Sequence, residues 1–171
     1  METDNLDIAV ASGNTDTEGT EIWNMGLVDQ LTTFDGRINR LRYLLLNILT
    51  LILGIVYAII VGVVLAILLI GMGLPELAFD ITFGLAMIPL VYVNYAIIVK
   101  RLQDTGRGDG WITYTQAFSV LILLYLMTPM GSSIESAIDL ITTIMGLPLG
   151  IVCLFFRGDA GPNQFGPDPL G

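Results

Sequence analysis

The chain has 171 residues, of which 54% are hydrophobic and only 13% are charged. Because soluble domains are about a quarter charged, a single water-soluble core cannot hide this much apolar surface, and lipid must be the solvent for much of the chain. There is no histidine and one cysteine, Cys153. This composition excludes a disulfide within the chain, a zinc site of His and Cys ligands, and histidine-based acid–base catalysis.

The first part of the chain is polar and acidic. It holds much of the net charge of −9, and residues 1–20 are predicted to be a disordered acidic tail. An acidic start is unlike a signal peptide, which begins basic, so we expect the first membrane helix to be an uncleaved anchor. Residues 21–34 follow with apolar side chains at three-residue steps, Ile22, Met25, Val28 and Leu31. This pattern predicts a short amphipathic helix that lies on the membrane surface or on the protein's own cytoplasmic face, the alternative being a loop with a few apolar residues.

Four long apolar runs then predict four transmembrane helices, at about residues 44–70, 81–99, 112–129 and 138–156. Each run is close to the roughly 20 residues needed to cross the hydrocarbon. Pro89 is expected to kink the second span. Gly146, Pro148 and Gly150 are expected to interrupt the fourth, and Ser132 to Glu135 has the spacing of a capping box, which predicts a helix start before that span.

The charges are segregated by this topology. All seven basic residues fall on one side of the membrane: Arg37, Arg40, Arg42, Lys100, Arg101, Arg107 and Arg157. The two opposite loops carry acidic residues only, Glu76, Asp80, Glu135 and Asp139. The positive-inside rule makes the basic side cytoplasmic. The fold class is therefore an all-α membrane protein, a four-transmembrane-helix bundle over residues 35–157 with both termini in the cytoplasm.

A stripe of small residues runs along the first span, at Gly54, Ala58, Gly62 and Ala66. The four-residue spacing puts them on one helix face, where small side chains let another helix approach closely. This candidate helix-packing face suits either another helix of this chain or a second copy of it.

Three motifs lie beside the predicted spans. They are FDGRINR at residues 34–40 followed by Tyr43, RLQDTGR at 101–107 followed by Gly110 and Trp111, and GPNQFGPDP at 161–169. In this order, over about residues 34–169, they resemble a family of multi-pass proteins of the bacterial inner membrane named domain of unknown function 805 (DUF805). The resemblance implies that location and four spans, but it brings no biochemical activity.

The chain departs from the family pattern at several positions. Gln103 stands where the family usually has His, so no role that needs an ionising imidazole can operate here. Arg42 replaces a common acidic residue, Leu44 a common Trp, and Gln164 a frequent basic residue. The segment Gly108–Gly110 is one residue longer than the usual Ser-Gly.

The three motifs meet at one membrane surface and give the candidate site, a cytoplasmic cap of Arg37, Arg40, Arg101, Asp104, Arg107, Asn163 and Asp168. We expect Asp104 to pair with an arginine of the first motif and the tail, residues 158–171, to pack over the loop. The remaining guanidinium groups could hold lipid phosphate, because arginine binds it bidentately. The alternative is that these residues only stabilise the loop and set the topology.

Two other groups of polar residues have plainer interpretations. Glu135 and Asp139 share a helix face and could hold a cation, but acids at a helix N-terminus are expected from the helix dipole alone. Asn47 and Asn94 lie within spans and favour an interhelical hydrogen bond over a transport site. No motif indicates nucleotide or nucleic-acid binding, a metal or a cofactor.

The predicted function is therefore non-enzymatic. The cap and the N-terminal segment would bind a partner protein or anionic lipid from the cytoplasmic side. The main alternative is a small transporter or pore that forms a homo-oligomer along the Gly54 to Ala66 stripe. Membrane-bound catalysis by Asp104 is the third hypothesis.

Overall fold

The computed structural model describes residues 27–169, and all of its elements are helices, as predicted. The predicted tail 1–20, the first part of the predicted helix 21–34 and the last two residues lie outside the described residues. The helices are α2 (Leu27–Thr32), α3 (Arg40–Gly71), α4 (Glu76–Ala86), α5 (Ile88–Asp104), α6 (Asp109–Leu126) and α7 (Ser133–Phe155).

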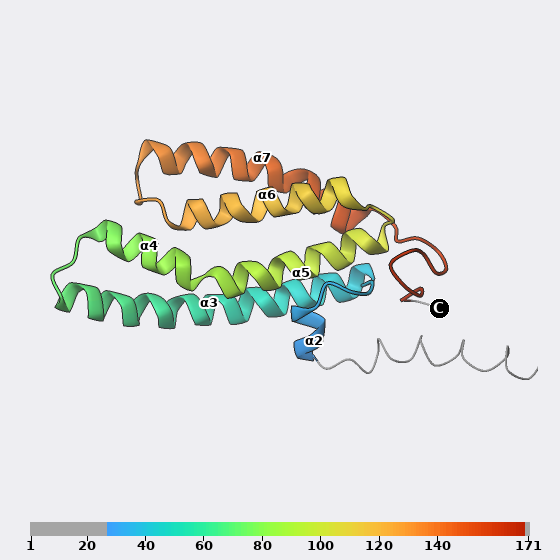
Figure 1. Ribbon diagram of the computed structural model, residues 1–171, viewed down its shortest axis with the longest axis horizontal. Coiled ribbons are helices and arrows are strands. Elements are labelled where there is room, and N and C mark those ends of the chain that lie inside the picture. Colours follow the sequence, from blue (N-terminus) through green and yellow to red (C-terminus); the bar gives the residue numbers. More distant parts are fainter. Residues whose placement is uncertain (1–26, 170–171) are drawn as a thin grey trace, which may run out of the picture.

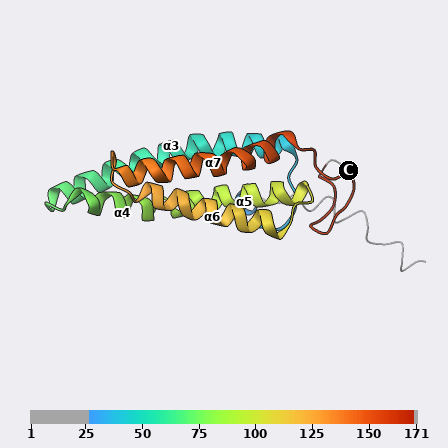
Figure 2. The ribbon, with the colours of Figure 1, turned by 90° about the horizontal axis from the view of Figure 1, so that it is seen from above.

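The long helices run alternately in opposite directions (Figure 1). α3 pairs with α4 and α5, α5 pairs with α6, and α6 pairs with α7. In the view turned by 90°, α3 lies beside α7 and α5 beside α6 (Figure 2). The hairpin of α3 and α4 extends further than that of α6 and α7 (Figure 1). α3 starts, α5 ends, α6 starts and α7 ends at the other end, which we call the polar end.

Apolar and polar side chains are distributed in the reverse of a soluble protein. Large apolar side chains along α3 are half or more exposed, such as Leu51 at 63% and Ile67 at 69%, while Lys100 is only 3% exposed. The apolar core lies at the polar end and joins α3, α5 and α7 through residues such as Tyr43, Ile97 and Cys153. Exposed apolar and buried charged residues are what a lipid solvent selects.

The small-residue stripe of α3 packs against the same chain. A side-chain carbon added at Gly54 would lie 3.0 Å from Leu90 of α5, and one at Gly62 would lie 3.7 Å from Phe83 of α4. The stripe therefore serves as the contact between α3 and the α4–α5 pair. An oligomer built along this stripe would have to displace that contact.

The second predicted span starts earlier than expected and is divided. α4 starts at Glu76 instead of residue 81, with Pro75 as its N-cap and Glu76 in the first turn, where the helix dipole favours an acid. The helical path breaks at Met87, two residues before Pro89. The kink that Pro89 predicts is therefore present, displaced towards the preceding turn.

Tyrosine hydroxyls from neighbouring helices donate hydrogen bonds to backbone carbonyls in the turns before Pro89 and Pro148. A proline has no N–H for the carbonyl four residues before it, and its ring presses on that preceding turn. Tyr57 of α3 donates to the carbonyl of Ala86 at 2.7 Å, and Tyr114 of α6 donates to that of Met145 at 2.9 Å. Both carbonyls lie three residues before a proline, since Pro148 follows Met145 in α7.

The predicted interruption of the fourth span is wrong. α7 continues from Ser133 to Phe155 with Pro148 inside it. One missing N–H removes one helical hydrogen bond, and membrane helices tolerate this when a neighbour supplies a donor. The predicted helix start is confirmed, because the Ser132 side chain accepts from the Glu135 N–H at 3.0 Å.

The described part of the predicted surface helix is α2, which packs against α5. α2 and the residues just after it contact aromatic and basic side chains of α5. Phe34 makes edge contacts with Tyr92 and Tyr95, at ring distances of 5.3 and 5.4 Å, and Lys100 donates to the Gln30 carbonyl at 2.6 Å. These contacts join α2 to the membrane domain. α2 also exposes apolar side chains, such as Val28 at 70%.

Three helical segments are long and apolar enough to cross a membrane: Arg40–Leu69, Glu76–Asp104 and Ser133–Phe155. The predicted third span forms α6, which is shifted to Asp109–Leu126 and is not among them. Its 18 residues rise about 27 Å, slightly less than the roughly 30 Å of the hydrocarbon. Its hydroxyl and amide side chains also lower its hydropathy. Length and composition alone therefore do not identify α6 as a membrane span.

Removing either tyrosine hydroxyl should destabilise the fold. We expect Tyr57→Phe and Tyr114→Phe each to lower the free energy of unfolding by about 1 kcal/mol, because each removes one hydrogen bond between neighbouring helices in an apolar environment. Thermal melts in detergent, followed by circular dichroism, measure the change. Tyr125→Phe is the control, since the Tyr125 hydroxyl has no hydrogen bond to any residue from 27 to 169. Equal melting temperatures for all three variants would contradict the assignment.

Candidate functional site

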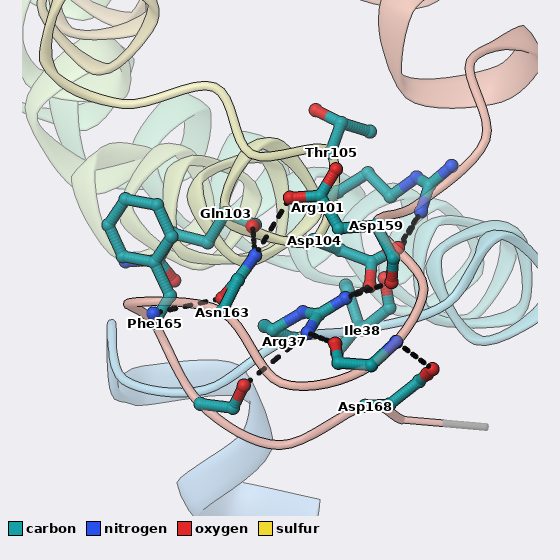
Figure 3. A network of polar contacts seen from close by, with 12 residues as sticks. Arg37, Ile38, Arg101, Gln103, Asp104, Thr105, Asp159, Asn163, Phe165 and Asp168 are labelled. Carbon is teal, nitrogen blue, oxygen red and sulfur yellow. Dashed lines mark hydrogen bonds and ion pairs between the residues drawn. The ribbon is translucent and has the colours of Figure 1, made fainter. Parts of the chain in front are cut away.

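Asp104, the last residue of α5, lies between two arginines. One carboxylate oxygen is 3.1 Å from Nη2 of Arg37, and the other contacts Nη1 of Arg101. The side chains of both arginines are 0% exposed and that of Asp104 is 4% exposed. We call these three residues the Asp104 cluster (Figure 3). A buried charge is tolerated only when it is paired and hydrogen-bonded, and here two positive charges face one negative charge, so carbonyl oxygens must satisfy the remaining donors.

Arg37 finds those carbonyls in the C-terminal tail. Its Nη1 donates to the carbonyl of Gly161 at 2.7 Å, and its Nη2 donates to that of Asp159 at 2.6 Å. The tail curves around the guanidinium (Figure 3). Arg37 therefore joins the segment before α3, the end of α5 and the tail after α7, which are the three motifs of the sequence.

Arg101 serves the end of α7 in the same way. Its Nε donates to the carbonyl of Cys153 at 2.8 Å, and its Nη2 donates to that of Phe156 at 2.6 Å. The last carbonyls of a helix lack helical partners and carry partial negative charge, which a cation stabilises. Arg101 thus acts as a C-terminal cap supplied by another helix.

Two glycines allow the tail to approach α5. A side-chain carbon at Gly158 would collide with the carboxylate of Asp104, and one at Gly106 would collide with that of Asp159. Gly106 also has a φ of 65°, a conformation that glycine adopts without strain. The Asp159 N–H donates to the Asp104 carbonyl at 2.7 Å, so backbone and side chains of the two segments interlock.

The tail motif folds into a turn that Asn163 and Asp168 close. The Asn163 side chain donates to the Gln103 carbonyl at 3.0 Å and accepts from the Phe165 N–H at 2.9 Å. Asp168 accepts from the Gly161 N–H at 2.8 Å. Both residues therefore support the tail, and neither contacts the Asp104 cluster through its side chain in these bonds.

Two of the arginines predicted for the cap lie outside the cluster. Arg107 is 4.2 Å from the ring centre of Phe156, a cation–π contact. Arg40 is exposed, and together with exposed Arg157 it lines a polar pocket of about 250 Å³ at the polar end. Among the predicted arginines, Arg37 and Arg101 are therefore buried and hold the chain, Arg107 is partly buried over Phe156, and Arg40 is exposed.

Sequence reasoning missed Arg157, Gly158 and Asp159 as parts of this site. They lie between the last span and the tail motif, where the sequence offers only a short Arg-Gly-Asp segment as a signal. Most acceptors of the buried arginines are backbone carbonyls, and a sequence does not show where these point. Gln103, where the family usually has His, has a buried side-chain oxygen without a partner among the described residues.

The other candidates remain apart from this site. Glu135 belongs to the cap of α7, and residues 27–169 contain no group of three or more side chains that could hold a metal ion. The interhelical hydrogen bond expected for Asn47 and Asn94 is wrong. Each donates to its own helix, Asn47 to the Tyr43 carbonyl at 2.8 Å and Asn94 to the Leu90 carbonyl at 3.2 Å, because an amide can reach the carbonyl four residues earlier.

A family model described as Protein of unknown function (DUF805) matches residues 31–167. The chain belongs to this family. The resemblance that the three motifs carry is thereby confirmed, and the motifs are now seen to be the segments that the Asp104 cluster joins. No curated protein and no solved structure matches this DUF805 chain. Its function must therefore be argued from its own geometry.

The Asp104 cluster makes a prediction for stability. Asp104→Asn leaves two buried arginines without a counter-charge, and we expect it to cost about 3–5 kcal/mol of unfolding free energy. Denaturant unfolding in detergent, followed by circular dichroism, measures the loss. Asp109→Asn is the control, because Asp109 is exposed at the start of α6 and should change stability by less than about 1 kcal/mol. Similar values for the two variants would mean that the cluster does not hold the fold.

Proposed function

We propose that this protein is a four-span protein of the bacterial cytoplasmic membrane with both termini on the cytoplasmic side. The supporting observation is the position of the basic residues. α3 starts, α5 ends, α6 starts and α7 ends at the polar end, and all seven basic residues lie on or beside these helix ends. The positive-inside rule makes that end cytoplasmic, and α6 then has to return the chain across the membrane between α5 and α7.

Accessibility of single cysteines tests this topology. In a Cys153→Ala background, Met130→Cys adds a thiol in the loop between α6 and α7, where Met130 is 90% exposed. Ala160→Cys adds one in the tail, at an exposed position. We expect a membrane-impermeant maleimide to label the Met130→Cys variant on intact cells, and the Ala160→Cys variant only after permeabilisation. The reverse pattern, or labelling of both on intact cells, would overturn the topology.

We further propose that the polar end acts by binding and not by catalysis, and that its ligand is an anionic lipid headgroup. Both terminal nitrogens of Arg37 and of Arg101 are bonded inside the chain, so these two arginines hold the shape of the surface. Arg40 and Arg157 are exposed beside one pocket, and their guanidinium groups suit a phosphate oxygen pair. Basic pockets at the cytoplasmic surface attract anionic headgroups.

The carboxylates of the pocket restrict the charge of that ligand. Asp104 lines it together with its partner Arg101, and Asp159 and Asp168 line it as well. Asp159 accepts a hydrogen bond from the Asn163 amide at 3.1 Å, and Asp168 accepts one from the Gly161 N–H. They oppose a dianionic phosphate monoester more than a singly charged phosphodiester. A phospholipid such as phosphatidylglycerol therefore fits better than a free phosphate or a nucleotide.

Lipid retention by the purified protein tests the lipid site. We expect purified protein to retain phosphatidylglycerol in native mass spectrometry over a phosphatidylcholine background, and inorganic phosphate not to compete. Arg40→Gln with Arg157→Gln should weaken retention about 10- to 30-fold, at about 1 kcal/mol per arginine. Arg107→Gln is the matched control, because Arg107 lies over Phe156. Equal retention by the double variant and the control would refute the site.

A further inference from the structure

A cavity of about 500 Å³ lies within the membrane-spanning part, between α3, the α4–α5 pair and α6. Its size falls in the usual range of ligand pockets, about 300–1,000 Å³. Most of its lining is apolar, including Ala58, Phe83, Met87 and Leu126. Three polar side chains also line it, Asn47, Thr50 and Asn94. None of the three takes part in the Asp104 cluster or in the pocket of Arg40 and Arg157.

Thr50 is the unusual member of this lining. Thr50 is only 5% exposed, and its hydroxyl has no hydrogen-bond partner in the described part of the chain. Several other threonines within helices donate to the carbonyl four residues earlier, Thr82 at 2.6 Å, Thr113 at 2.9 Å and Thr115 at 2.8 Å. A buried hydroxyl without a partner is costly, so a partner from outside the chain would offset that cost.

Asn94 leaves further hydrogen-bonding capacity. It donates one N–H to the Leu90 carbonyl, but an amide has two N–H donors and an accepting oxygen. The second N–H and the oxygen have no partner among residues 27–169. The cavity thus combines unsatisfied hydroxyl and amide groups with an apolar wall.

The polar groups gather at the shallow end of the cavity. Asn47 is seven residues after Arg40, which corresponds to about 10 Å along α3, whereas Ala58 is about 27 Å along it. Asn94 is ten residues before Asp104, the last residue of α5, about 15 Å from the polar end, whereas Phe83 lies further along the α4–α5 pair. The lining therefore changes from polar to apolar with depth, as a lipid of the cytoplasmic leaflet does.

We infer that this cavity binds an uncharged membrane lipid whose polar end carries hydroxyl or ester groups, of which a diacylglycerol is the simplest. The lining contains no charged side chain, so a phosphate would be buried without a counter-charge. The lipid hydroxyl and ester oxygens would meet Thr50, Asn47 and Asn94, and an acyl chain would lie against the deeper apolar wall. This inference requires the chain to span a membrane and is independent of the phospholipid site proposed at Arg40 and Arg157.

Photolabelling tests the inference. The full-length protein in phosphatidylcholine nanodiscs is exposed to dioleoylglycerol that carries a diazirine in one acyl chain, or to phosphatidylglycerol with the same chain. We expect the dioleoylglycerol probe to label peptides within residues 47–58 and 83–94, and unlabelled dioleoylglycerol to compete. The phosphatidylglycerol probe should label lipid-facing positions without such competition. Equal labelling of these peptides by both probes would mean ordinary surrounding lipid and would overturn the proposal.

Variants locate the contacts. Thr50→Val and Asn94→Leu should each reduce competed labelling about fivefold, the effect of losing one hydrogen bond. Thr142→Val is the matched control, because the Thr142 hydroxyl is also buried without a partner among the described residues but does not line the cavity. Ala58→Phe, which fills the deeper part, should abolish the signal. Thermal melts check that each variant is folded, and unchanged labelling in folded Thr50→Val, Asn94→Leu and Ala58→Phe would refute the site.

Discussion

The burial of Asp104 between Arg37 and Arg101 is the constraint on which the rest of the structure depends. A carboxylate at the end of α5, removed from water, requires opposite charge, and two buried guanidinium groups in turn require acceptors. The acceptors are carbonyls of the tail and of the last turn of α7. Through its two arginines, one aspartate therefore joins the segment before α3, the end of α7 and the tail, which explains why three distant motifs form a single unit.

This constraint acts at one end of the molecule only. Lipid does not distinguish the inside of a membrane protein from its outside by hydrophobicity, so helices there associate by close packing and polar contacts. Along the helices those contacts include Gly54 against Leu90, Gly62 against Phe83, and the two tyrosine hydroxyls beside Pro89 and Pro148. The buried ion pairs lie at the polar end. The basic residues beside the helix ends therefore stabilise the fold and also carry the proposed topology.

The sequence allows much of this arrangement to be predicted, and its limits have physical causes. Apolar runs indicate helices because hydropathy is a property of composition, and the small-residue stripe follows from its spacing. Composition says less about α6, whose polar side chains are mixed with apolar ones, and about Pro148, whose effect depends on a tyrosine in another helix. In the site, Arg37, Arg101 and Asp104 could be predicted because their charges stand out. Their carbonyl acceptors could not, since every residue has a carbonyl and only the fold decides which ones are free.

The division of the arginines explains how one surface can be both rigid and able to bind. Arg37 and Arg101 would lose their role if a ligand drew them away, because their donors already hold the backbone of the tail and of α7. Arg40 and Arg157 hold no such contacts in the cluster and stand beside it on a frame that the buried pair fixes. The cavity between α3, the α4–α5 pair and α6 lies farther from the polar end, and no member of the Asp104 cluster lines it. The buried charges therefore order the polar end, whereas the lipid that we infer for the cavity would meet hydroxyl and amide groups instead.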